Sequence, residues 1–245
     1  MRFNPVNLEK SCNPVKGFML ILIIALGAFA QSPPQRVEQP KEVVEAYRVC
    51  AQFQKLLAED LDFSPAFEAT FTKDARRRRE IANAEGEFGS VDLSSIDDAT
   101  LIDAFKSRMQ IVFLFLAFAG PDNKAEEDLF FPPAVKTILD RKPPADPRDF
   151  SSYVTQLKRD AVDFRAHVDQ LAARNASVAE RIRKFKAEIS KPVEISTYKV
   201  EPLTSYSHGR VLGPEEEYYR IGDYAVIREG NEMRIIGILF FSRLF

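Results

Sequence analysis

The sequence has no tryptophan, and it has only two cysteines and two histidines among 245 residues. Two cysteines cannot form the disulfide framework that stabilises many small secreted domains. The chain also lacks CxxC, HExxH, GxSxG and glycine-rich phosphate-binding motifs, so we expect no bound metal ion and no cofactor. Lys and Arg total 34 against 36 Asp and Glu, a formal net charge of −2. This balance argues against the basic surface that nucleic-acid binding requires, and we expect no nucleic-acid partner.

Residues 1–30 are typical of a secretory signal peptide. Basic residues precede an uncharged, apolar run over residues 17–30, which ends in Ala28 and Ala30 with A-x-A spacing. A bilayer-spanning helix needs about 20 apolar residues, so we predict cleavage near Ala30, although an uncleaved anchor is the alternative. The exported chain, periplasmic or secreted, would then contact the membrane through this segment alone. It would keep one cysteine, Cys50, which lies at helical spacing among apolar residues and is interpreted as a buried, inert thiol.

A proline-rich linker and a helical region follow the signal segment. Residues 31–40 are polar and contain three prolines, which indicates a linker. Residues 41–145 are predicted to be helical, because apolar residues recur at helical spacing over 41–59 and again over 98–119.

Four consecutive arginines, Arg76 to Arg79, lie in this helical region between an aspartate and a glutamate. Such a run can bind phosphate groups or anionic lipids. No second basic cluster and no interleaved aromatic residues accompany it, so we favour a solvated helix face with local ion pairs.

The most regular pattern occupies residues 146–191. Asp146 and Pro147 are typical of a helix start, and Lys191-Pro192 is typical of an end. The sequence therefore predicts a helix over about 147–190. Its seam residues recur at alternating spacings of four and three, which is a heptad pattern: Phe150, Val154, Leu157, Ala161, Phe164, Val168, Leu171, Asn175, Val178, Ile182, Phe185 and Ile189.

Asn175 is the polar member of this seam and leaves alternatives open. A polar residue at such a position can fix the register and oligomeric state of a coiled coil, so the helix could pair with a second copy or with an envelope protein. We favour packing along the chain's own helices 41–59 and 98–119, which also need partners. The weak helix-forming run at 175–177 also allows a break that would create a helical hairpin.

Residues 192–245 change from helical to alternating periodicity and predict an antiparallel β region packed on the helices. Strands are expected over 193–200, 218–228 and 233–241, with a hairpin loop at 229–232. A two-residue turn at Gly222-Asp223 could split the middle strand. The fold class is α+β: a helical layer with one long heptad-patterned helix and a C-terminal antiparallel sheet of three to four strands.

Candidate catalytic residues are confined to this β region. Tyr206 and His208 share a polar loop, and Tyr218 and Asp223 follow in the same region, so the four could form an acid/base pocket. Nothing in their spacing forces them together, and we therefore favour an ordinary polar turn.

Both ends of the mature chain resemble secreted NTF2-like domains. The helical motif PKEVVEAY soon after the signal segment and the closing hairpin YAVIREGNEMRIIGI are similar to the two ends of those cone-shaped domains, over residues 41–71 and 193–241. Met233 stands where those proteins usually have tryptophan, and residues 72–192 would be a long helical insertion. The resemblance implies a curved sheet and helices that enclose a pocket, used more often for binding or assembly than for catalysis.

Composition, motifs and resemblance together lead to one functional expectation. We expect an exported, non-enzymatic binding or assembly protein of the cell envelope. The alternative is a small-pocket enzyme that uses His208 with Asp223 or Tyr206.

Overall fold

The computed structural model describes residues 39–86, 88, 91–119, 137–138, 140–192, 198–202 and 217–238. The chain divides into the units Met1–Gln39 and Pro40–Phe245, and every element below belongs to the second. Several predicted features lie outside the described residues: the signal segment 1–30, most of the linker, and both Tyr206 and His208.

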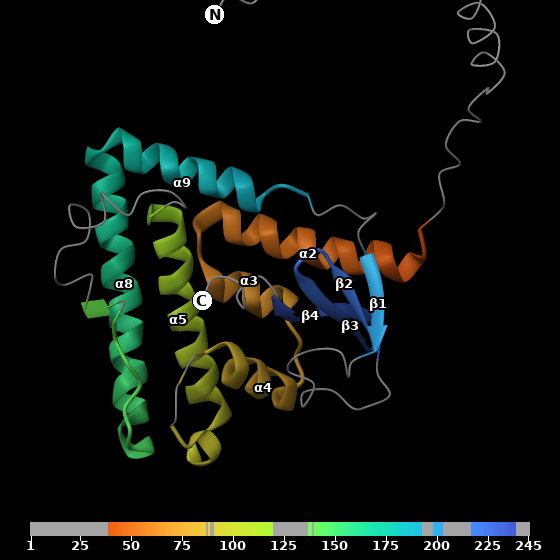
Figure 1. Cartoon of the computed structure of the whole chain (residues 1–245), viewed down its shortest axis with the longest axis horizontal. Coiled ribbons are helices and arrows are strands. Elements are labelled where there is room, and N and C mark those ends of the chain that lie inside the picture. The colour runs from red at the N-terminus through yellow and green to blue at the C-terminus, as the bar shows by residue number, and fades with distance from the viewer. Residues whose placement is uncertain are drawn as a thin grey trace, which may run out of the picture. The chain divides into compact units, whose positions relative to one another are not determined.

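The described part of the second unit is mostly helical and ends in an antiparallel sheet, which confirms the α+β class. The 3-10 turn Pro147–Asp149 leads directly into the longest helix, so that this helical segment has 28 residues. The helices, labelled as in Figure 1, are α2 (Lys41–Asp60), α3 (Phe63–Thr70), α4 (Ala75–Glu85), α5 (Asp98–Ala119), α8 (Phe150–Arg174) and α9 (Ala176–Ile189). The strands are β1 (Tyr198–Pro202), β2 (Glu217–Ile221), β3 (Tyr224–Glu229) and β4 (Glu232–Ile238).

Helix α8 lies alongside α5 of the same chain (Figure 1). The expected start is confirmed, because the Asp146 carboxylate accepts a hydrogen bond from the backbone N–H of Arg148 at 2.9 Å and Pro147 follows it. The seam of α8 is covered within one copy of the chain. Its buried members are Phe150, Val154, Leu157, Ala161, Phe164 and Val168.

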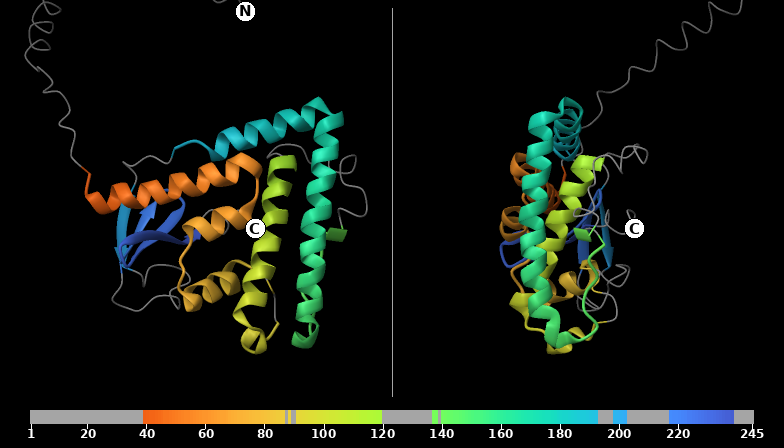
Figure 2. Two further views of the ribbon diagram at one scale, coloured as in Figure 1. Left: turned by 180° about the vertical axis from the view of Figure 1, so that it is seen from behind. Right: turned by 90° about the vertical axis from the view of Figure 1, so that its left-hand side faces the viewer.

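The helix predicted over 147–190 is interrupted at Asn175, so the structure has the break that the weak helix-forming run at 175–177 allowed, in place of one continuous helix. Asn175 has extended backbone angles (φ −129°, ψ 107°), and its side-chain oxygen accepts hydrogen bonds from the backbone N–H groups of Ser177 and Val178. It is therefore the N-cap of α9 instead of a polar residue within a continuous seam. After this break α9 leaves the direction of α8 and lies along α2, as Figure 2 shows from behind.

The sheet has the strand order β1-β2-β3-β4, with antiparallel pairing throughout. The predicted strand 218–228 is in fact two strands, because Gly222 has a φ of 57° and forms a tight turn with Asp223. The expected loop at 229–232 is confirmed, and Gly230 supplies its positive φ of 60°. Residues 193–197 and 239–241 of the predicted strands lie outside the described residues.

Helix α2 contacts β2, β3 and β4, so one face of the sheet is covered by the first helix of the unit. The chain after α3 runs beside the last strand: Phe71 bridges to Ile235, and the N–H of Thr72 donates to the Ile235 carbonyl at 3.0 Å. Phenylalanines of α2, α3 and α5 pack together at this junction, and the rings of Phe53 and Phe63 meet edge to face. The core therefore joins the helices and the sheet into one body.

The arginine run at Arg76–Arg79 is only partly the solvated face that we expected. Arg78 donates to Glu68 at 2.7 Å and its guanidinium lies 4.8 Å from the centre of the Phe67 ring. Arg79 donates to the Ile96 carbonyl at 2.7 Å and also pairs with Asp98. Both side chains are half-buried, so these two arginines stabilise the packing of α4 against α3 and α5.

Candidate functional site

An apolar cavity of about 310 Å³ lies where α2, α5 and α9 meet the sheet, next to the turn between β2 and β3. Its position follows from the break at Asn175, because that break brings α9 across to α2. The residues that line it come from three helices, two strands and the β2–β3 turn: Phe53, Gln54 and Leu57 of α2, Phe113 of α5, Phe185, Glu188 and Ile189 of α9, Gly222 and Asp223 of the turn, Tyr224 of β3 and Ile238 of β4.

The walls of the cavity are mainly hydrocarbon. Phe53, Leu57 and Phe113 are buried, whereas Phe185 and Ile189 of α9 are only half-buried. Part of the apolar surface on the α9 side is thus still accessible to water. A ligand that covered it would gain the free energy of removing apolar surface from water.

Tyr224 contributes a polar group, its phenol, to the lining of this cavity. Burial raises the pKa of its hydroxyl above the ordinary value, nearby Cys50 and the Asp223 carboxylate act in the same direction, and a hydrogen bond with Gln54 opposes them. The phenol therefore stays neutral at physiological pH and is able both to donate and to accept a hydrogen bond.

Two carboxylates lie at the cavity, and none of the lining residues that the structure describes is a Lys, Arg or His. Glu188 forms an ion pair with Lys191, which lies one turn farther along the chain. Asp223, in contrast, has no ion-pair partner within the part of the chain that the structure describes. The electrostatic character of the cavity is consequently negative.

Cys50 lies behind the cavity wall and is fully buried. Burial raises the pKa of its thiol far above the ordinary value, so the sulfur stays protonated. It has neither the exposure nor the ionisation that a nucleophile needs.

The structure does not bring the four catalytic candidates together in one described site. Asp223 lines the cavity. Tyr218 is 2% exposed within β2 and is not one of the lining residues, so the structure does not bring these two together there. Tyr206 and His208 lie outside the described residues.

Most of the cavity has no signal in the sequence. Among its lining residues, Phe185 and Ile189 were predicted only as members of a seam, and Asp223 only as a candidate acid. The α2 stripe around Phe53 and Leu57 indicates burial, yet periodicity does not distinguish a residue that faces a cavity from one that faces a filled core. The glycine turn before Tyr224 was the one available signal for the β2–β3 edge.

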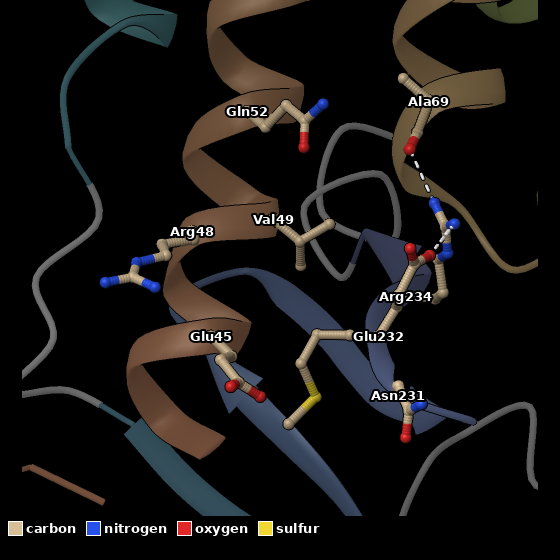
Figure 3. Close-up of a pocket in the computed structure, with 9 residues that line it drawn as sticks. Glu45, Arg48, Val49, Gln52, Ala69, Asn231, Glu232 and Arg234 are labelled. Carbon is tan, nitrogen blue, oxygen red and sulfur yellow. Dashed lines mark hydrogen bonds and ion pairs between the residues drawn. The ribbon is translucent and has the colours of Figure 1, made fainter. Parts of the chain in front are cut away.

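A second, polar cleft of about 360 Å³ lies between α2 and the β3–β4 hairpin. Figure 3 shows Val49 and Gln52 of α2 on one side, with Glu232 and Arg234 on the other. Arg234 donates to the Ala69 carbonyl at 2.7 Å and pairs with Glu232. Arg234 and Glu232 thus largely neutralise each other on this side of the cleft.

Within the described ranges, no cluster of three or more His, Cys, Asp or Glu side chains could hold a metal ion. None of the helices in those ranges combines the length and the apolar character that a bilayer crossing needs.

Comparison with protein-family models, with curated proteins and with solved structures finds no match for this chain.

Proposed function

We propose that this chain is a non-enzymatic binding protein that holds a small, largely apolar molecule in the cavity between α2, α5, α9 and the β2–β3 turn. The observation that supports this most strongly is the apolar lining, in which Phe185 and Ile189 remain partly exposed to water. A concave, mostly apolar site with a few convergent polar groups is typical of small-molecule binding. Tyr224 and Gln54 supply such groups.

Export is a further part of the proposal. The signal-like residues 1–30 support it. The resemblance to NTF2-like domains agrees with helices that cover a sheet beside a cavity. We therefore place the binding function in the cell envelope or outside the cell.

Calorimetric titration with n-alcohols of increasing length tests the binding proposal. Each methylene that leaves water contributes about 0.8 kcal/mol, so affinity should rise about fourfold per methylene until the cavity is full. Ile189→Trp places a larger side chain at the cavity and should abolish binding. Ala187→Trp is the matched control, because Ala187 lies on an exposed position of the same helix and does not line the cavity.

These titrations would overturn the proposal in either of two ways. One is the absence of binding at every chain length. The other is equal loss of affinity in both tryptophan variants, which would indicate damage to α9 instead of a filled cavity.

The alternative, a small-pocket enzyme, is favoured by one observation: Asp223 lines the cavity beside Tyr224. In this hypothesis His208 acts with Asp223 or Tyr206 as an acid/base pair. Loss of a measured activity in His208→Ala, with the melting temperature unchanged, would favour the enzyme over the binding protein.

A further inference from the structure

The charged side chains described in the lining of the proposed ligand cavity are all acidic. Its ionisable lining groups are the carboxylates of Glu188 and Asp223 and the phenol of Tyr224, and no basic side chain is among its described lining residues. An apolar ligand would shield Asp223 from water. Removing an ionised carboxylate from water without a partner is costly, so the cavity as built disfavours neutral and anionic ligands.

Asp223 is held in place by its backbone. It is the second residue of the two-residue turn between β2 and β3, and Gly222 before it has the positive φ that this turn requires. Since Tyr224 and Ile221 are paired across the strands, the turn is fixed to the sheet. The backbone of Asp223 is thus positioned before any ligand arrives, and no cation from the described residues neutralises its carboxylate.

Aromatic rings supply a second reason to expect a cation. Phe53, Phe113, Phe185 and Tyr224 all line the cavity, and the rings of Phe53 and Tyr224 are 6.0 Å apart with an interplanar angle of 69°. Aromatic faces attract organic cations, and sites lined by several rings are the usual way in which proteins recognise quaternary ammonium groups. The rings and the carboxylate thus favour the same kind of ligand.

We propose that the ligand of this cavity is a small organic cation, with an ammonium group facing Asp223 and the aromatic rings and with an alkyl portion against Leu57 and Ile189. This inference rests on the proposed function, because it names the ligand class for the same cavity. Glu188 contributes less than Asp223, since Lys191 already pairs with it.

Three probes of equal chain length separate charge from hydrophobicity: hexyltrimethylammonium, hexanol and hexanoate, each titrated calorimetrically into the purified protein. The ammonium should bind at least about tenfold more tightly than hexanol, and hexanoate should bind most weakly. The preference for the ammonium over hexanol should shrink at high salt, because Asp223 is partly accessible to solvent.

Asp223→Asn should remove most of this preference by weakening the binding of the ammonium, while the affinity for hexanol rises, because a neutral amide costs less than a carboxylate to remove from water. Asp163→Asn is the matched control, because it alters the net charge equally from an exposed position on α8 and should leave all three affinities unchanged. Glu188→Gln should have a smaller effect than Asp223→Asn.

The possible results are distinguishable. Equal binding of hexyltrimethylammonium and hexanol, or tighter binding of hexanoate, overturns the cationic ligand and leaves the binding protein standing. An ammonium preference that persists in Asp223→Asn overturns the role of that carboxylate. If none of the three probes binds, the cavity is not a ligand site, and both the proposed function and this inference fail.

Discussion

The side-chain oxygen of Asn175 accepts a hydrogen bond from the backbone N–H of Ser177 at 2.9 Å, and this contact is where the heptad-patterned segment changes direction. From this break α9 runs to α2, where Phe185 and Ile189 line the cavity. The cap thus marks the position from which α9 contributes to the candidate site.

Replacement of Asn175 by Leu should lower the free energy of unfolding by about 1 kcal/mol, because the N-cap of α9 is lost. Urea denaturation measures this, and Asn175→Asp is the control that retains a capping oxygen. A continuous intermolecular coiled coil predicts the opposite sign. A more stable Leu variant with an altered oligomer distribution in light scattering would contradict the cap.

The ion pair between half-buried Arg141 and buried Asp160 should be important for stability. The Asp160 side chain is 3% exposed, and it accepts hydrogen bonds from Arg141 at 3.2 Å and from Gln156 at 2.9 Å. Arg141→Ala leaves a buried carboxylate without its cation and should destabilise the protein by about 3 kcal/mol. Thermal or urea unfolding provides the measurement.

The double variant Arg141→Met with Asp160→Leu separates ion pairing from packing. Two apolar side chains leave no unpaired charge, so its stability should return to within about 1 kcal/mol of the original protein. A double variant that is as unstable as Arg141→Ala would show that shape, instead of charge, dominates at this contact.

Acid should weaken a charge network that links α3, α4, α5 and α8. Burial acts to raise the pKa of Glu68, but hydrogen bonds from Arg78 and Lys106 outweigh it and hold that pKa below its ordinary value of 4.5. Burial likewise acts against the ionised form of Asp103, and Lys158 and Lys106 together lower its pKa below 3.8. Because both folded-state pKa values are depressed, this stabilisation is present above the unfolded-state values and is lost as pH falls through the folded-state ones.

Lys106→Met therefore should cost more stability at about pH 7 than at about pH 3, as measured by urea denaturation. Lys55→Met is the control, because its pair with Glu59 is exposed and 4.0 Å long, and its cost should be small at both pH values. An equal loss at the two pH values in Lys106→Met would contradict the network.

The sequence predicted the class of the fold because its periodicities are local. The apolar stripe of α2, the seam of α8 and the glycine of the 229–232 loop each report a structure that neighbouring residues determine. Asn175 was ambiguous because asparagine is accepted both at a coiled-coil seam and at a helix N-cap. Which role Asn175 takes depends on whether residues 176–189 pack better on α2 or as a straight continuation of α8. That is a tertiary property.

The cavity could not be predicted from the sequence, because it too depends on tertiary packing. Phe53 and Phe113 have the same pattern whether they pack against atoms or face a void, and Tyr224 is far from both in the sequence. Asp223 was identified as a candidate acid, but its neighbours in space come from α2 and α9, which no spacing motif connects.

The most direct test of the account is to locate a bound apolar molecule by nuclear magnetic resonance. With methyl-labelled isoleucines, bound hexanol should give intermolecular nuclear Overhauser effects to Ile189 and Ile238, which line the cavity. Ile81 and Ile96, buried elsewhere, should show none. Contacts to Ile81 or Ile96 without contacts to Ile189 and Ile238 would contradict the assignment of this cavity as the ligand site.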